Sequence, residues 1–97
     1  MAVEAIGISW YKPEDYDRMK RMFKDGWKLP DTYEEWLAEA EKAAAQLTAQ
    51  GFVVVRSPLD PKAFPEWCRA RGLEMTGETR SVYSAEYAGN NYFGKVH

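Results

Sequence analysis

The chain has 97 residues, of which 45% are hydrophobic and 29% are charged, and its formal net charge is −2. This composition is typical of one globular domain, and it argues against both whole-chain disorder and a strongly basic nucleic-acid binder. A single cysteine, Cys68, excludes an internal disulfide, and one histidine at the chain end leaves no Cys/His set for structural zinc.

The first predicted elements are a strand and a helix. Apolar and small residues alternate over residues 3–10, which predicts a strand with one buried face. Pro13 suits the first turn of a helix, where its missing N–H costs nothing. We expect this helix to stop at Asp25–Gly26, because glycine accepts the left-handed conformation of a helix cap.

A second, longer helix is predicted after a loop over residues 26–31. Thr32 and Glu35 have the spacing of a capping box, which marks the start of a helix, and Gly51 marks its end. Apolar residues follow the helical i, i+3, i+4, i+7 rule in this segment. We expect these positions to be buried: Trp36, Leu37, Ala40, Ala44 and Leu47.

The third and fourth predicted elements are a short strand and a helix. Residues 52–56, FVVVR, are rich in β-branched residues, and we interpret them as a strand buried on both faces, with Val53 and Val55 in the core. Asp60 and Pro61 mark a helix start, and Gly72 marks its end. The inner face of this helix consists of Phe64, Trp67 and Cys68.

The C-terminal part of the chain has weaker signals. Residues 78–88 favour a fourth helix that ends at Gly89, with a strand over residues 79–83 as the alternative. We predict one globular domain over residues 1–90 and a loose tail over residues 91–97.

The fold class that follows is a helix-rich α+β domain with the order β-α-α-β-α-α. If the strands pair in parallel, the helical hairpin between them is their crossover connection. Two strands alone make a marginal sheet. We therefore expect a third strand, either from residues 91–96 or from a second copy of the chain.

The anchors of these elements resemble a group of short uncharacterised bacterial proteins. The resemblance covers residues 8–70 and includes the patterns W-Y-x-P-x-D-Y, L-P-x-T-Y-x-x-W and D-P-x-x-F-x-x-W-C. In this chain these residues are Trp10, Tyr11, Pro13, Asp15, Tyr16, Leu29, Pro30, Thr32, Tyr33, Trp36, Asp60, Pro61, Phe64, Trp67 and Cys68. The resemblance implies a bacterial origin and carries no activity.

Sequence motifs for catalysis are missing. The chain has no G-x-S-x-G nucleophile elbow and no glycine-rich phosphate loop. Cys68 falls on the apolar face of its helix, which indicates a buried structural thiol rather than a nucleophile. We expect no catalytic residue, no metal and no cofactor.

Two groups of residues are candidates for binding. Parallel strands end at the same edge of a sheet, where α/β proteins commonly bind ligands. This position holds the ligand-cleft candidates Ser9, Trp10, Tyr11, Arg56 and Ser57. The basic residues of the first helix could contact a nucleic-acid backbone, although a solvated face is the simpler interpretation. These nucleic-acid candidates are Lys20, Arg21, Lys24 and Lys28.

We interpret the chain as a non-enzymatic protein-interaction or regulatory module that forms a homodimer. The alternatives are a weak nucleic-acid binder that uses the first helix, and a small enzyme or ligand binder at the strand ends. The N-terminus has no basic region of the kind that begins a signal peptide, and no apolar run is long enough to span a bilayer. We therefore expect a cytoplasmic protein with no membrane partner.

Overall fold

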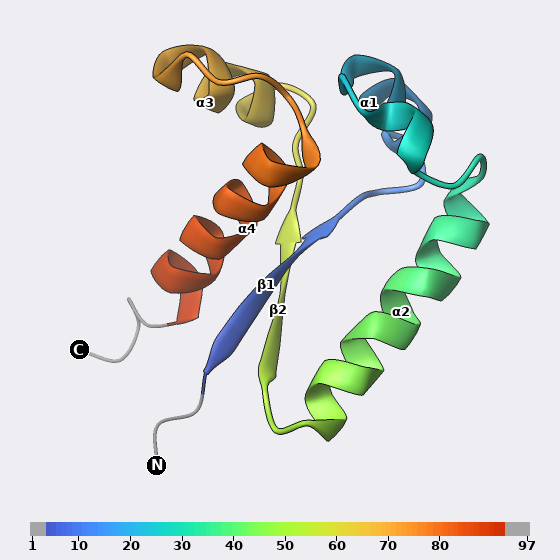
Figure 1. Ribbon diagram of the computed structural model, residues 1–97, viewed down its shortest axis with the longest axis vertical. Helices are drawn as coiled ribbons and strands as arrows, with labels where there is room; N and C mark the ends of the chain where they lie inside the picture. Colours follow the sequence, from blue (N-terminus) through green and yellow to red (C-terminus); the bar gives the residue numbers. More distant parts are fainter. Residues whose placement is uncertain (1–3, 93–97) are drawn as a thin grey trace.

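The computed structural model describes residues 4–92 and has the predicted order of helices and strands (Figure 1). One 3-10 turn is added between the first two helices. The elements are β1 (Ala5–Trp10), α1 (Tyr16–Met22), η1 (Gly26–Lys28), α2 (Tyr33–Ala49), β2 (Val53–Pro58), α3 (Ala63–Arg71) and α4 (Gly77–Tyr92). The prediction of a helix-rich α+β domain is confirmed. None of the helices over residues 4–92 has the length and hydropathy of a membrane-spanning segment.

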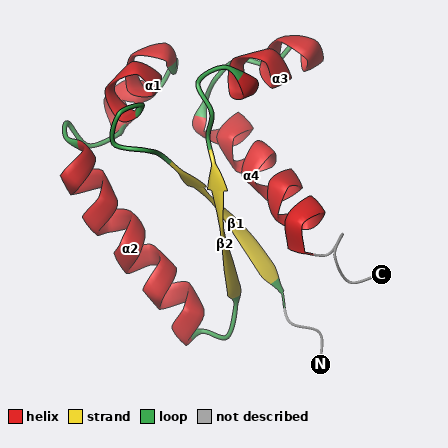
Figure 2. Ribbon diagram, turned by 180° about the vertical axis from the view of Figure 1, so that it is seen from behind, coloured by secondary structure: helices red, strands yellow, loops and turns green. Residues whose placement is uncertain are grey.

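The sheet consists of two parallel strands, in a register that places Ala5 opposite Val53 and Trp10 opposite Pro58. The hairpin of α1 and α2 forms the crossover connection between them. Helices α2 and α4 lie on opposite sides of the sheet in both views (Figures 1 and 2). The molecule measures 41 × 31 × 20 Å. The two strands overlap when the molecule is viewed down its shortest axis, so both edges of the sheet face out along this axis.

Local sequence signals fix several helix ends as predicted. The side chain of Thr32 accepts a hydrogen bond from the backbone N–H of Glu35, at 3.1 Å, and so caps α2. Gly51 follows α2 with a φ of 97°, and Gly72 caps α3 with a φ of 65°. A side chain at either position would be strained, because only glycine adopts these conformations readily.

The predicted end of the first helix is wrong, because α1 ends at Met22 rather than at Asp25–Gly26. Gly26 begins the 3-10 turn η1, and its φ is not positive. A Cβ atom at Gly26 would overlap the backbone carbonyl of Lys20. Glycine is therefore required here for close approach of two backbone segments, not for a left-handed cap.

The prediction that the second strand is buried on both faces is also wrong. Val53, Val54 and Val55 are half-buried, as are all six residues of β1. In α2, Trp36, Ala40 and Ala44 are buried as predicted, whereas Leu37 and Leu47 are half-buried. A sheet of two strands is too narrow for two helices to cover both of its faces completely.

The hydrophobic core lies beyond the carboxyl ends of the strands rather than on the sheet. Its buried residues come from both post-strand loops and from α1, α2 and α3: Tyr11, Tyr16, Met19, Phe23, Trp36, Ala40, Leu59, Phe64 and Cys68. Aromatic rings meet there edge to face, for example Tyr11 and Trp36 at 4.8 Å between centroids. The Tyr16 hydroxyl donates a hydrogen bond to the Pro30 carbonyl, and burial raises the pKa of Tyr16 to about 12.

Helix α4 is longer than predicted, and the alternative of a strand over residues 79–83 is not adopted. Thr76 and Thr79 form a reciprocal cap at its start, in which the Thr76 N–H donates to Thr79 Oγ1 at 2.8 Å. The expected third strand over residues 91–96 does not form at Asn91 and Tyr92, because both belong to α4. The remaining residues of that segment lie outside the described part of the chain.

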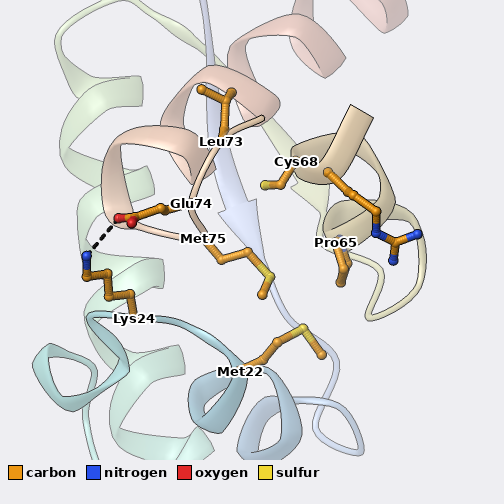
Figure 3. Close-up of a pocket in the computed structure, with 8 residues that line it drawn as sticks. Met22, Lys24, Pro65, Cys68, Leu73, Glu74 and Met75 are labelled. Atoms are coloured by element: carbon orange, nitrogen blue, oxygen red, sulfur yellow. Dashed lines mark hydrogen bonds and ion pairs between the residues drawn. The ribbon is translucent and has the colours of Figure 1, made fainter. Parts of the chain in front are cut away.

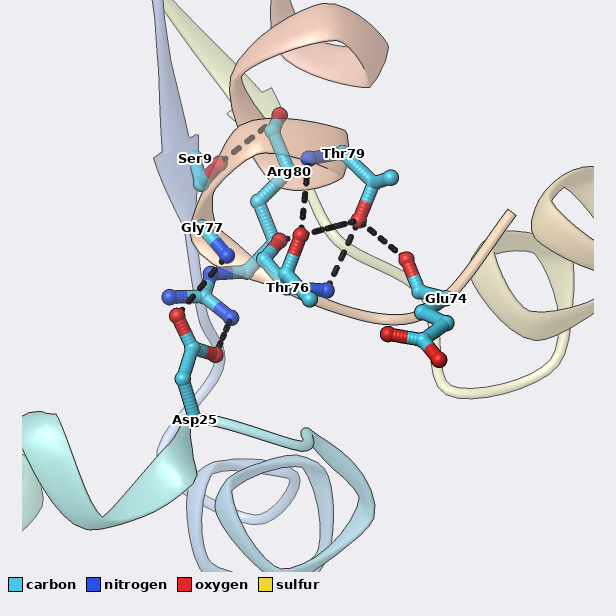
Figure 4. A network of polar contacts seen from close by, with 7 residues as sticks. All are labelled: Ser9, Asp25, Glu74, Thr76, Gly77, Thr79 and Arg80. Atoms are coloured by element: carbon cyan, nitrogen blue, oxygen red, sulfur yellow. Dashed lines mark hydrogen bonds and ion pairs between the residues drawn. The ribbon is translucent and has the colours of Figure 1, made fainter.

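A polar network fixes α4 to the rest of the fold (Figure 4). Arg80 pairs with Asp25 at 2.8 Å, and the Gly77 N–H donates to the same carboxylate at 2.9 Å. Burial alone would raise the pKa of Asp25, but the hydrogen bonds from Arg80 and Gly77 outweigh it and hold this pKa below its ordinary value. The network thus joins the start of α4 to the segment between α1 and η1.

A seam of small residues brings α4 close to the sheet. The hydroxyls of Ser9 and Ser84 are 2.6 Å apart, and the Ser57 hydroxyl donates to the Ser84 carbonyl at 3.0 Å. A Cβ atom at Gly7 would overlap the same carbonyl. This face of β1 therefore accepts only very small side chains.

Candidate functional site

The five ligand-cleft candidates do not line one cavity. Ser9 and Ser57 lie against α4 in the small-residue seam, and Tyr11 is buried in the core. Trp10 and Arg56 lie on the other face of the sheet, where the Arg56 guanidinium is 4.2 Å from the Trp10 ring centroid. Arg56 also pairs with Glu41 of α2 at 3.0 Å. Side chains alternate between the faces of a strand, and this alternation separates the predicted set.

A cleft of about 320 Å³ does lie at the carboxyl ends of the strands, as their parallel arrangement predicts. Different side chains line it. Apart from Trp10 and Pro58, which end the two strands, they come from the loops that follow the strands and from α4: Lys12, Asp15, Leu59, Asp60, Tyr83 and Tyr87. Sequence reasoning missed the two tyrosines, because they are more than twenty residues from either strand end.

The charges of this cleft do not favour an anion at the start of α3. Asp60 accepts hydrogen bonds from the backbone N–H groups of Ala63 and Lys62, at 2.7 and 2.9 Å, and these bonds lower its pKa. The helix terminus is therefore already satisfied by a carboxylate. Burial, followed by the charge of Asp60, raises the pKa of Tyr83, so its hydroxyl stays protonated at neutral pH.

The four nucleic-acid candidates do not form a uniform positive face, and only Lys20 and Arg21 belong to α1. Lys20 lies 4.0 Å from Asp31, and Lys24 pairs with Glu74 at 2.8 Å. Lys28 lies over the ring of Trp27. Arg21 is exposed and forms no ion pair within residues 4–92. Acidic neighbours therefore offset the positive charge of two of the four nucleic-acid candidates, Lys20 and Lys24.

Cys68 lines an open pocket of about 480 Å³ between α1 and α3 (Figure 3). Its thiol is buried, and burial raises its pKa, which keeps the sulfur protonated and weakly nucleophilic. Met22 and Met75 also line this pocket, together with the Lys24–Glu74 ion pair and Arg69. Within the described residues, no group of His, Cys, Asp and Glu side chains has the arrangement of a metal site. The lining of the pocket is therefore a mixture of apolar and charged side chains.

An apolar groove of about 720 Å³ separates α2 from β2 on the opposite side of the molecule. Alanines of α2 and valines of β2 line most of it, and the Arg56–Glu41 ion pair lies at one end. Helix α2 packs on β2 but has little contact with β1. Ile6 and Ile8, which point to the same side as Trp10, therefore remain only partly buried.

The open sheet is the most distinctive surface of the molecule. Most residues of its strands are apolar, yet no residue of β1 is fully buried, and neither outer edge is paired within residues 4–92. Unpaired sheet edges with apolar strands are the usual templates for strand addition. The fold and this surface together define a small α+β domain whose two-stranded sheet is only partly covered by the described residues.

A family model described as a domain of unknown function (DUF8829) matches residues 3–93, and the chain belongs to this family. This agrees with the resemblance to uncharacterised proteins noted in the sequence. No curated protein and no solved structure matches the chain.

Proposed function

We propose that this chain is a non-enzymatic protein-interaction module that forms a homodimer through its sheet. The observation that carries the proposal is the incomplete burial of the apolar residues on both strands. Isolated two-stranded sheets are marginal, and extension by a partner would add hydrogen bonds and cover apolar surface at once. The single cysteine, whose thiol is buried, agrees with a cytoplasmic location, which we include in the proposal.

The other two candidate functions have less support. Ion pairs offset the charges of Lys20 and Lys24, which weakens the case for a nucleic-acid surface. The strand-end cleft lies near the lower limit of volume for a small-molecule site, and Asp60 is occupied in capping α3. Neither feature forms a set of residues that converges on one ligand.

Sedimentation equilibrium at micromolar concentrations tests the proposal. We expect a monomer–dimer equilibrium in which the heavier species has twice the monomer mass of 11.2 kDa. Burial of apolar surface drives this association, so raising the salt concentration should leave it unchanged or strengthen it. A single 11.2 kDa species at every concentration would refute self-association.

A further inference from the structure

The hydrogen bonds at the two ends of the sheet determine which backbone groups of β1 are used. The Val53 N–H donates to the Glu4 carbonyl, and the Leu59 N–H donates to the Trp10 carbonyl, both at 2.9 Å. In a parallel pair, alternate residues of a strand bond to the same neighbour. Ile6 and Ile8 therefore bond to β2 as well. The N–H and C=O groups of the intervening residues, Ala5, Gly7 and Ser9, point away from β2.

The same alternation defines the outer edge of β2, where Val54, Arg56 and Pro58 point away from β1. Pro58 has no N–H to offer a partner strand, and Arg56 carries a charge that is already paired with Glu41. Proline and charged residues are the devices that protect sheet edges from strand addition. The outer edge of β2 is therefore blocked.

The outer edge of β1 has no such protection. Ala5, Gly7 and Ser9 are small and uncharged, and their side-chain positions point toward α4 rather than across the edge. No backbone hydrogen bond outside the ladder uses the N–H or C=O group of any of the three within residues 4–92. Within residues 4–92, nothing pairs with this edge.

We propose that β1 pairs antiparallel with β1 of a second copy, about a twofold axis at Gly7. This inference rests on the proposed homodimer and specifies its interface. Gly7 would then lie opposite Gly7 of the partner subunit, and Ala5 opposite Ser9 of the partner subunit. Each of these pairs exchanges two hydrogen bonds. This register uses all three outward residues of both copies, and a shift by two residues would leave some of them unpaired.

The side chains on the α2 side of the sheet fit the same register. Ile6 would lie opposite Ile8 of the partner subunit, in the closely spaced pair type of an antiparallel ladder. Both isoleucines are only partly buried in one copy, because α2 lies mainly over β2. Pairing at this edge would therefore cover these two partly exposed side chains further, in a four-stranded sheet of order β2-β1-β1-β2.

Matched proline variants at the two edges test which edge pairs. Ala5→Pro removes an N–H that the chain itself does not use, so we expect the fold to persist and the dimer dissociation constant to rise roughly tenfold or more. Val54→Pro makes the equivalent change on the outer edge of β2, and we expect it to leave the dissociation constant nearly unchanged. Circular dichroism verifies that both variants fold. A dimer that survives Ala5→Pro and dissociates with Val54→Pro would overturn the inference while the proposed homodimer stands.

Cysteine pairs test the register, even if a proline variant fails to fold. An Ile6→Cys chain mixed with an Ile8→Cys chain should form disulfide-linked dimers under mild oxidation, because closely spaced antiparallel pairs fall within disulfide reach. Each variant alone should form few, and the unmodified chain none, since Cys68 is buried. Efficient linkage of Ile6→Cys to itself, or no linkage in a mixture that sedimentation shows to be dimeric, would contradict the twofold axis at Gly7.

Discussion

The core beyond the strand ends and the sheet itself are built differently, although the same apolar residue types supply both. In the core, Tyr16, Met19 and Phe64 are at most 1% exposed and are surrounded by other aromatic rings. On the sheet, every residue of β1 and the valines of β2 are only half-buried. The difference teaches that packing between helices and loops supplies most of the buried core, whereas the apolar side chains of the sheet are only partly buried.

The largest expected effect is the loss of a core ring. Phe64→Ala removes a buried side chain that contacts Phe23 and Tyr83 edge to face, with centroids 5.8 and 5.3 Å away. We expect the free energy of unfolding to fall by roughly 3–5 kcal/mol, measured by urea denaturation. The exposed Leu73 provides the control, since Leu73→Ala should change it by less than about 1 kcal/mol. Similar losses in both variants would show that burial is not concentrated beyond the strand ends.

The next largest effect concerns the Asp25–Arg80 ion pair, which joins α4 to the segment between α1 and η1. Asp25→Asn keeps the shape of the side chain but leaves Arg80, which is 11% exposed, without its counter-charge. We expect a loss of about 1–3 kcal/mol in the free energy of unfolding. Asp31→Asn is the control, because Asp31 is almost fully exposed and its ion pair is long. Equal stability of the two variants would mean that α4 is held by the sheet alone.

The same ion pair predicts that the free energy of unfolding depends on pH. The pKa of Asp25 is lower in the folded chain than its ordinary value of 3.8. Its contribution is therefore present in full above the unfolded pKa and is lost as the pH falls through the folded pKa. In urea unfolding from about pH 6 to about pH 2, the unmodified chain should lose more stability than Asp25→Asn. Parallel curves for the two chains would contradict this prediction.

The smallest effect is expected on the open face of the sheet. Val54→Thr keeps a β-branched side chain and adds a hydroxyl beside the groove, so we expect a loss below about 1 kcal/mol in thermal unfolding. Ser57→Val is the reverse change on the other face of β2, where the hydroxyl is buried and bonded to the Ser84 carbonyl. It should lose about 1–3 kcal/mol. A larger loss for Val54→Thr would show that the groove is part of the core.

Local signals were sufficient to predict the element order. The cap at Thr32 and the glycines at positions 51 and 72 act within a few residues of themselves, so they can be read directly from the sequence. The end of α1 was wrong because Gly26 is fixed by contact with Lys20 rather than by its own φ. The Asp25–Arg80 ion pair joins residues that are 55 positions apart, and no local sequence pattern indicates it.

The ligand-cleft candidates were chosen by their position along each strand and not by face. A cleft lies at the carboxyl ends of the strands, but of these candidates only Trp10 lines it. Alternation alone would have separated Ser9 from Trp10. The open edge of β1 needed the register with β2, which only the structure supplies.

The seam between Ser9 and Ser84 has a consequence for the order of folding. It joins residues 75 apart, so β1 receives its cover only after the chain has been synthesised through Ser84 of α4. Contacts so distant in sequence form slowly, because a long loop must close before they add stability. Until α4 arrives, a nascent chain presents both faces of β1, and strand edges exposed in this way favour aggregation. Docking of α4 is therefore expected to be a late step in the folding of residues 4–92.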